Sequence, residues 1–501
     1  MNAGRSSAIT YWRKNLTELF EFCPPKDFLE AIWGWNSMVA ERHQAGLTKV
    51  NFNGDLQGFQ FGNSLWFPQW HLESLTNRFL AFHVDGKRSK RTLRIREWGG
   101  FAKLLNTMNR LENVESLVDV SEGGIIDAMQ RLFWPQYSWQ IGYVKAHRVS
   151  RSWIIYGGPE CSRVFLEKYD VELIEFLRIS FMLFAGATSN PIVNERALIG
   201  TGASTLDVMR AINVISKEFN ELTEIACDQQ LELENSVYNR SAIRENPVIR
   251  IVGRNGRLVF APLPELILAR ITDALYYDIV NDGASRHEAG VAFEELSYEM
   301  LSVRTCSGWH VERPEKTIGE GCCDMALISP EHHCRVLIEC KARRIARRVL
   351  SSPMPWSEAK SNYSDIIKGV SQIWRTAYLW EGPKSDVVGT ILTLDPWMYL
   401  APYVKELFES ARELAQNKFG NKFLEIPLGF AASDDFERVS GKLETNEFVD
   451  RLVALAREER FGHSLQASAT DSSGNEILGR VDPFDYNERL SQVIPWWRQT
   501  T

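Results

Sequence analysis

The segment 320–344, EGCCDMALISPEHHCRVLIECKARR, constrains the fold more than any other stretch of the chain. It contains two β-type runs, MALIS and CRVLIECK, on either side of the short polar run PEHH. Such a pattern predicts a β-hairpin in which Ser329 pairs with Cys334 across a four-residue loop. Counting back along both strands, this register places Asp324 directly opposite Glu339.

The predicted register gathers three charged side chains on one face. Directly opposed residues of antiparallel strands point the same way with Cβ atoms ~5 Å apart, and Lys341 follows Glu339 by two residues on that face. Two opposed carboxylates repel each other, and a divalent cation between them would remove the repulsion. Oxygen ligands suit Mg²⁺, with Mn²⁺ as a substitute. The bound metal would lower the pKa of a water, and Lys341 could neutralise charge developing on a phosphate.

The flanking sequence predicts further elements in a definite order. Residues 286–301 form a helix pattern, and SVRTCSGWHVERP supplies a first strand before the hairpin. Residues 364–380 form an amphipathic helix, and residues 387–395 form a strand. The C-terminal half is therefore expected to run helix, three strands, helix, strand.

This order, with Asp324 followed fifteen residues later by Glu339-x-Lys341, resembles the PD-(D/E)xK nuclease superfamily. Restriction endonucleases, Holliday-junction resolvases and bacterial defence nucleases belong to it. Gly290-x-x-Phe293-Glu294 resembles the first motif of the family, and Cys323 occupies the position of its variable proline. The resemblance implies an α/β restriction-endonuclease-like core (αβββαβ) that spans roughly residues 285–430.

The resemblance also implies a set of site residues. Asp324, Glu339 and Cys340 are the expected metal ligands. The expected catalytic residues are Glu294, Asp324, Glu339, Lys341 and Gln372. For Glu294 an ordinary solvated position on an amphipathic helix is an equal alternative.

Basic residues near the predicted site are the expected nucleic-acid contacts. The whole chain has a net charge of −7, so binding to a polyanion must come from such local groups. A solvated basic surface is the alternative. The residues are Arg343, Arg344, Arg347 and Arg348 after the second hairpin strand, and Lys368 and Arg375 on the helix that follows.

The cysteines leave a second chemistry open. Five of the eight cysteines fall between 306 and 340, together with His310, His332 and His333, so a zinc site is conceivable. No CxxC pair is present, however, and alternation turns Cys323 and Cys340 away from the carboxylates. Buried thiols are the interpretation we favour.

The rest of the chain predicts a division into four parts. Residues 1–245 are a mainly helical α+β region without a recognisable motif, and 246–284 are a hairpin around Asn255-Gly256 and a connecting helix. Residues 285–460 form the nuclease-like domain, and 461–501 form a linker and tail. The apolar stretch 173–187 contains two charged residues and predicts a buried helix, not a membrane span.

These observations lead to one expected function and two alternatives. The expectation is a cytoplasmic, Mg²⁺-dependent endonuclease acting on DNA, similar to restriction or antiviral defence effectors and working with partner proteins of such a system or as a homo-oligomer. A non-cleaving nucleic-acid-binding or sensor protein on the same fold is one alternative. An RNase with the same core is the other.

Overall fold

The structure of the chain is a computed structural model. It describes residues 3–40, 67–82, 92–115, 136, 138–139, 146–199, 202–230, 240–253, 256–314, 318–319, 321–347, 363–395, 404–457, 465 and 484–495.

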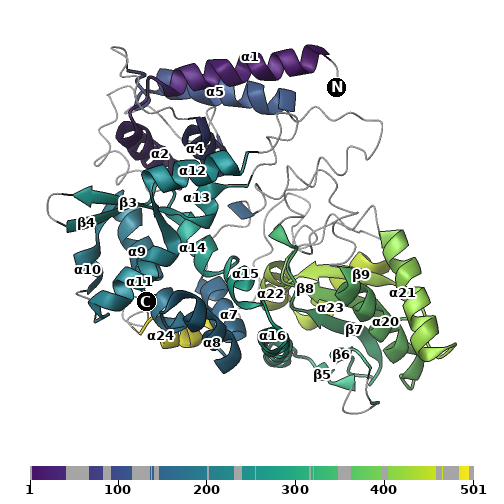
Figure 1. Cartoon of the computed structure of the whole chain (residues 1–501). Helices are drawn as coiled ribbons and strands as arrows, with labels where there is room; N and C mark the ends of the chain where they lie inside the picture. Colours follow the sequence, from purple (N-terminus) through teal and green to yellow (C-terminus); the bar gives the residue numbers. More distant parts are fainter. Residues whose placement is uncertain are drawn as a thin grey trace. The chain divides into compact units, whose positions relative to one another are not determined.

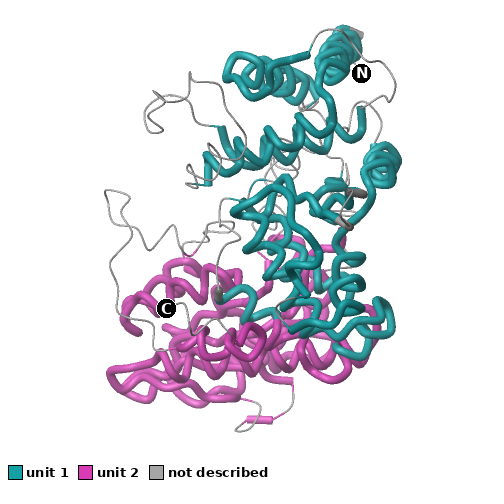
Figure 2. The backbone as a smooth tube through the Cα atoms, turned by 90° about the vertical axis from the view of Figure 1, so that its left-hand side faces the viewer, with its two compact units in different colours: residues 1–152, 162–279 teal, residues 153–161, 280–501 magenta. Residues whose placement is uncertain are grey.

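The chain divides into two compact units, which Figure 2 shows in different colours. The first unit comprises residues 1–152 and 162–279, and the second comprises residues 153–161 and 280–501. The change from one to the other at residue 279 falls within the segment 246–284. None of the described helices is both long enough and apolar enough to cross a membrane.

The first unit is mainly helical, as its sequence predicts. Its core is rich in aromatic side chains; Trp35, for example, is fully buried and stacks on Phe101 with ring centroids 4.5 Å apart. Such rings contribute large buried apolar areas. Its helices are α1 (Ala3–Phe20), α2 (Pro25–Val39), α4 (Gln69–Phe82), α5 (Trp98–Glu115), α9 (Leu173–Ser189), α10 (Glu195–Ile199), α11 (Thr205–Ile215), α12 (Phe219–Asp228), α13 (Ala242–Glu245), α14 (Glu265–Ile271) and α15 (Leu275–Ile279). The helices α7 (Ala146–Tyr156) and α8 (Pro159–Tyr169) are shared, because the end of α7 and the start of α8 fall within residues 153–161.

A four-stranded sheet accompanies these helices, in the order β1-β4-β3-β2. The predicted hairpin forms its centre, with Gly253 of β3 paired to Gly256 of β4. The predicted buried helix is also present as α9, whose apolar residues face the interior of this unit. The strands are β1 (Ile192–Asn194), β2 (Ser216–Glu218), β3 (Val248–Gly253) and β4 (Gly256–Phe260).

A five-stranded mixed sheet forms the centre of the second unit, in the order β5-β6-β7-β8-β9 (Figure 1). The first three strands are antiparallel neighbours, and β8 and β9 continue the sheet in parallel to β7. Every residue of β6 and β8 is buried; the sequence of β6 is wholly apolar, and β8 also carries the buried Thr390 and Thr393. The strands are β5 (His310–Glu312), β6 (Met325–Ile328), β7 (Cys334–Lys341), β8 (Val388–Thr393) and β9 (Leu428–Ala432).

Helices cover both faces of this sheet (Figure 1). Helix α20 lies on the face that carries Glu339, with α21 packed beside it. Helices α16 and α23 lie on the other face, where Leu455 of α23 packs over Gly429. The bounds are α16 (Gly283–Arg304), α20 (Ser364–Leu379), α21 (Val404–Phe419), α22 (Ser433–Lys442), α23 (Thr445–Arg457) and α24 (Tyr486–Val493).

The predicted order of helix, three strands, helix and strand is present as α16, β5 to β7, α20 and β8. Two expectations need correction. The first strand is only His310–Glu312, because α16 continues through Arg304. The segment 461–501 is not only linker and tail, because α24 folds there and the hydroxyl of Tyr486 donates to the sulfur of Met300 at 3.5 Å.

The central register of the β6–β7 hairpin is as predicted. Met325 pairs with Ile338, and one further step toward the strand end sets Asp324 against Glu339. The side-chain alternation that follows from this register places Lys341 on the face of Glu339.

The closed end of the hairpin differs from the prediction. Ile328, not Ser329, pairs with Cys334, and a bulge at this end shifts the register by one residue. The reason is a tight turn in which His332 adopts a left-handed backbone with φ of 62°. The main-chain N–H of Ser329 then donates to the carbonyl of His333 at 2.9 Å.

A short segment from the middle of the chain belongs to the second unit, which the sequence did not predict. Residues 153–161 end beside α16, where the N–H of Cys161 donates to Glu288 at 2.8 Å. A Cβ on Gly158 would lie 2.4 Å from the carboxyl carbon of Glu288. The segment is therefore fitted closely against this helix.

The packing of α20 on β8 yields a test of the second unit's core. A Cβ at Gly389 would lie 2.2 Å from Cδ2 of Leu428 and 2.7 Å from Cγ2 of Ile373. We expect Gly389→Ala to lower the free energy of unfolding by ~1–3 kcal/mol through overpacking, measured by urea denaturation. Gly290→Ala is the control; no neighbouring atom lies within 4 Å of the added Cβ, so this helix variant should be ~0.5–1 kcal/mol more stable. Equal effects of the two substitutions would contradict this packing.

Candidate active site

Glu339 lies in the central strand of the second unit and is 1% exposed. Its Oε1 accepts a hydrogen bond from Nζ of Lys341. Its Oε2 is buried and has no hydrogen-bond partner among the described residues. A buried carboxylate oxygen without a donor costs free energy unless a proton or a cation meets it.

Lys341 is the basic member of the group. Besides its bond to Glu339, its Nζ donates to Oε1 of Gln372 at 3.3 Å. The amide nitrogen of Gln372 donates in turn to the main-chain carbonyl of Cys322, also at 3.3 Å. Gln372 thus connects the ammonium group to the segment that precedes Asp324.

Asp324 lies immediately before β6, at the end of the β6–β7 ladder. Its Oδ2 accepts a hydrogen bond from the main-chain N–H of Cys340 at 2.7 Å. Because β6 begins only at Met325, the carboxylate supplies the acceptor that a longer strand would offer from its main chain. Asp324 also acts electrostatically on both Glu339 and Lys341. The structure therefore brings these three predicted residues together.

The electrostatics of the group are those of a carboxylate pair around one ammonium. Burial, and then the neighbouring Asp324 carboxylate, raise the pKa of Glu339 to about 8, although Lys341 opposes them. Burial lowers the pKa of Lys341, but Glu339 and Asp324 outweigh it and hold that pKa above its usual value. The ammonium is therefore charged, and Glu339 is the acid whose ionisation is costly.

Helix α20 presses directly on this group. A Cβ at Gly369 would lie 3.0 Å from Cε of Lys341, 3.1 Å from Cγ of Glu339 and 3.2 Å from Cδ1 of Ile391. A glycine therefore allows the helix backbone to lie directly over the two charged side chains. Sequence reasoning missed Gly369, although a glycine in the middle of an amphipathic helix is a signal that could have drawn notice.

Glu294 of α16 lies at the edge of the group. Its Oε1 is 3.7 Å from Nη1 of Arg313, which binds the adjacent Glu295 more closely, at 2.5 Å through Nη2. The charge of Glu294 makes a small contribution to the raised pKa of Glu339. Glu294 is thus near the site but makes a weaker approach than Asp324.

No family model, no curated protein and no solved structure matches the chain.

The predicted metal ligand Cys340 does not offer a thiolate. Its side chain is buried, and burial followed by the Asp324 charge raises the pKa of the thiol well above its usual value. Ser297 of α16 is its hydrogen-bonding neighbour, on the face away from Glu339. Cys323 is likewise buried with a raised pKa, so both are neutral thiols.

The histidines near the turn of the hairpin lie apart from this group. His310 of β5 bonds Glu312 at 3.0 Å, and its ring centroid is 6.2 Å from that of His332. The described cysteines of the second unit are all free thiols. Among the residues that the structure describes, no cysteine and histidine lie together as a zinc-binding set.

The predicted nucleic-acid contacts fall into two groups, and the first includes a correction. Arg344 is buried and forms an ion pair with the buried Asp395 after β8. It is therefore a structural residue, because a phosphate contact would require breaking that pair. Arg343 is half-buried and pairs with Asp365 at the start of α20. Arg347 is half-buried, and Arg348 lies outside the described residues.

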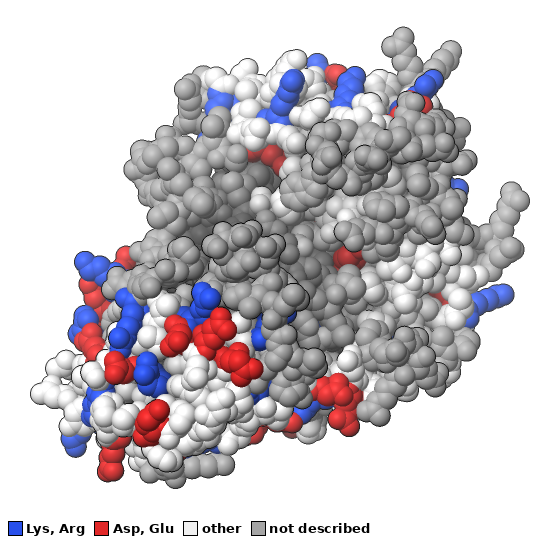
Figure 3. All heavy atoms as spheres, turned by 180° about the vertical axis from the view of Figure 1, so that it is seen from behind, with Lys and Arg blue, Asp and Glu red and all other residues white. Residues whose placement is uncertain are grey.

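The second group lies on α20. Lys368 is exposed, one turn before Gln372. Arg375 donates to the main-chain carbonyl of Lys422 at 2.9 Å and lies over the ring of Phe419. Lys368 is thus the more accessible of the two cations. On the face drawn in Figure 3, described basic and acidic side chains are interspersed and do not form a purely basic area.

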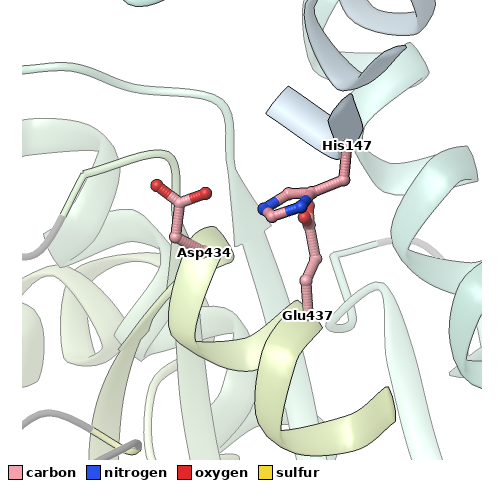
Figure 4. Close-up of side chains that lie close together, drawn as sticks. All are labelled: His147, Asp434 and Glu437. Atoms are coloured by element: carbon pink, nitrogen blue, oxygen red, sulfur yellow. The ribbon is translucent and has the colours of Figure 1, made fainter. Parts of the chain in front are cut away.

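Another acidic pair lies in the first turns of α22. Asp434 and Glu437 are 7% and 5% exposed, and Figure 4 shows both side chains on this helix. Asp434 lies in the first turn of α22, where an acidic side chain suits the positive end of the helix, and Glu437 follows one turn later. His147, also drawn in Figure 4, belongs to the first unit.

The raised pKa of Glu339 yields a prediction about the metal-free protein. Because this pKa rises from its ordinary value of 4.5 to about 8, the folded state holds a proton that the unfolded chain releases. The contribution of Glu339 to stability therefore falls as pH rises through that window. Glu339→Gln imitates the protonated acid. In EDTA we expect wild type and variant to melt at similar temperatures near pH 4.5, and the variant to melt higher above pH 8.

The control for this experiment is Glu312→Gln on β5, which should follow the wild-type melting profile. A difference between Glu339→Gln and wild type that stays constant with pH would show that Glu339 ionises in the folded protein as it does in the unfolded chain.

A second prediction separates the buried arginine from the exposed lysine. Arg344→Ala should lower the free energy of unfolding by ~3–5 kcal/mol, because it leaves the buried Asp395 charge without its partner.

Lys368→Ala should leave the melting curve unchanged and reduce the salt slope of duplex DNA binding by ~0.9 if the side chain contacts a phosphate. Denaturation and binding at several salt concentrations measure both effects. A harmless Arg344→Ala would return that residue to the nucleic-acid contacts.

Proposed function

We propose that the second unit is a metal-dependent phosphodiesterase with a restriction-endonuclease-like core of the PD-(D/E)xK type, and that it cleaves DNA. One observation carries the proposal above the others. Glu339 is a buried carboxylate beside a second carboxylate, and its Oε2 has no hydrogen-bond partner among the described residues. Such an arrangement is costly in a purely structural role and is explained by a cation that binds there in the active protein.

The residues present fit a hard divalent cation. Asp324 and Glu339 would supply carboxylate oxygens, which suit Mg²⁺ or Mn²⁺. Cys340 would contribute through its main-chain carbonyl, because its thiol is neutral and turned toward α16. When bound, the metal would activate a water and stabilise charge on the phosphate.

The side chains of this chain would have distinct roles in the reaction. Lys341 places a positive charge beside the carboxylates, where negative charge develops on the phosphate, and Gln372 holds that ammonium in position. Glu294 is a further acid near the edge of the site. Asp324, besides binding metal, keeps its hydrogen bond to the Cys340 N–H. Lys368, exposed one turn from Gln372, is the cation that we expect to contact the nucleic-acid backbone.

The proposal is tested by incubating the purified full chain with supercoiled plasmid, single-stranded DNA and RNA. Each substrate is combined with Mg²⁺, Mn²⁺ or EDTA. We expect nicked or linear plasmid in either metal and intact plasmid in EDTA. Glu339→Gln should be folded and inactive. Cleavage of RNA alone would identify an RNase, and DNA binding without cleavage under all conditions would favour the sensor alternative.

Lys341 gives the sharpest prediction for catalysis. Lys341→Met keeps the aliphatic stem but removes the charge, so cleavage should slow by a factor on the order of 10²–10³. Mn²⁺ binding, measured by calorimetry, should persist because Asp324 and Glu339 remain. The matched control is Lys405→Met on the exposed side of α21, which should cleave at the wild-type rate. A Lys341→Met enzyme within a few-fold of wild type would remove this lysine from the mechanism.

A further inference from the structure

Two side chains of α20 hold the main chain immediately before Asp324. Gln372 donates to the carbonyl of Cys322 at 3.3 Å. One turn along the helix, Oγ1 of Thr376 accepts a hydrogen bond from the main-chain N–H of Cys323 at 2.8 Å. These peptides need such partners because β6 begins only at Met325, so they lie outside the sheet ladder.

The hydroxyl of Thr376 is fully committed in this position. The side chain is 0% exposed, and its Oγ1 donates to the carbonyl of Gln372 at 2.8 Å. Its hydrogen therefore points back along the helix, which leaves a lone pair facing the N–H of Cys323. Cys323 is also completely buried, so water has no access to replace this acceptor.

The hydrogen bond between Thr376 and the N–H of Cys323 also restrains the neighbouring Asp324. The peptide fixed by Thr376 is one residue from Asp324, whose carboxylate is in turn tied to the Cys340 N–H at 2.7 Å. Two hydrogen bonds therefore restrain Asp324, one at its carboxylate and one at the main chain of the preceding residue. Thr376 itself contacts neither Lys341 nor Glu339 through any hydrogen bond between described residues.

We propose that Thr376 is a positioning residue that sets Asp324 for metal binding. This inference rests on the proposed function of the site. Thr376 acts only on the main chain before Asp324, whereas Gln372 contacts both that main chain and the ammonium group of Lys341. Loss of the Thr376 hydroxyl should therefore weaken metal binding and leave the environment of Lys341 in place.

The test compares Thr376→Val, which keeps the shape but loses the acceptor, with Thr376→Ser, which keeps the hydroxyl. Mn²⁺ affinity is measured by calorimetry on the full chain, after melting curves in EDTA show that each variant is folded. We expect valine to weaken Mn²⁺ binding by about 10–100-fold, as for other residues that orient metal ligands. Serine should restore the affinity to near the wild-type value.

Thr390→Val is the matched control. Thr390 is a buried threonine of β8 whose Oγ1 has no hydrogen-bond partner among the described residues, and it lies on the face of the sheet opposite Glu339. Its substitution should leave Mn²⁺ affinity unchanged. If Thr376→Val does not fold, Thr376→Ala replaces it and should bind Mn²⁺ more weakly than Thr376→Ser.

The outcomes separate the two proposals. A folded valine variant, or its alanine substitute, that binds Mn²⁺ as tightly as the serine variant would overturn the role of Thr376 while leaving the proposed function intact. Wild-type protein that binds no Mn²⁺ would instead overturn the proposed function, and the role of Thr376 in metal binding with it.

Discussion

The buried hydrogen bond from the Lys341 ammonium to the Glu339 carboxyl group is the interaction around which the second unit is arranged. A buried ammonium beside a buried acid needs further polar partners. The structure supplies these through Gln372, which bonds the ammonium, and through Asp324 at the end of the neighbouring strand. Gly369 allows the α20 backbone to lie directly on the pair. The sheet, α20 and the charged side chains thus depend on one another. The remaining free-energy cost is that of burying Glu339 Oε2 without a hydrogen-bond partner among the described residues.

Much of this arrangement could be predicted from the sequence because it depends on local periodicity. Strand alternation and hairpin pairing set Asp324 against Glu339 and put Lys341 on the same face. Gln372 was expected at the site only from the resemblance to the PD-(D/E)xK family, because helical spacing by itself shows no more than that it lies on the polar side of its helix. The closed end of the hairpin was less predictable. The register shifts there by one residue, and the left-handed backbone in the turn falls on His332, not on a glycine that would have indicated it.

Contacts between distant segments account for what the sequence did not reveal. Arg344 belongs to a basic cluster in the sequence, but in the structure it forms an ion pair with Asp395. No local sequence pattern indicates that pairing. Thr376 stands where the resemblance would place an aromatic residue, and no local pattern indicates that its hydroxyl accepts a hydrogen bond from the main-chain N–H of Cys323. In both cases the deciding partner lies about fifty residues away in the sequence.

The segment 153–161 has a consequence for how the second unit is built. It is synthesised well before α16, yet it is fitted against that helix through Gly158 and through the bond from Cys161 to Glu288. Joining these pieces closes a loop of more than a hundred residues, and such closure is slow relative to local folding. The second unit is therefore completed by a segment that is synthesised before the rest of it. A fragment that begins at residue 280 would lack residues 153–161 and leave the Glu288 carboxylate without its main-chain donor.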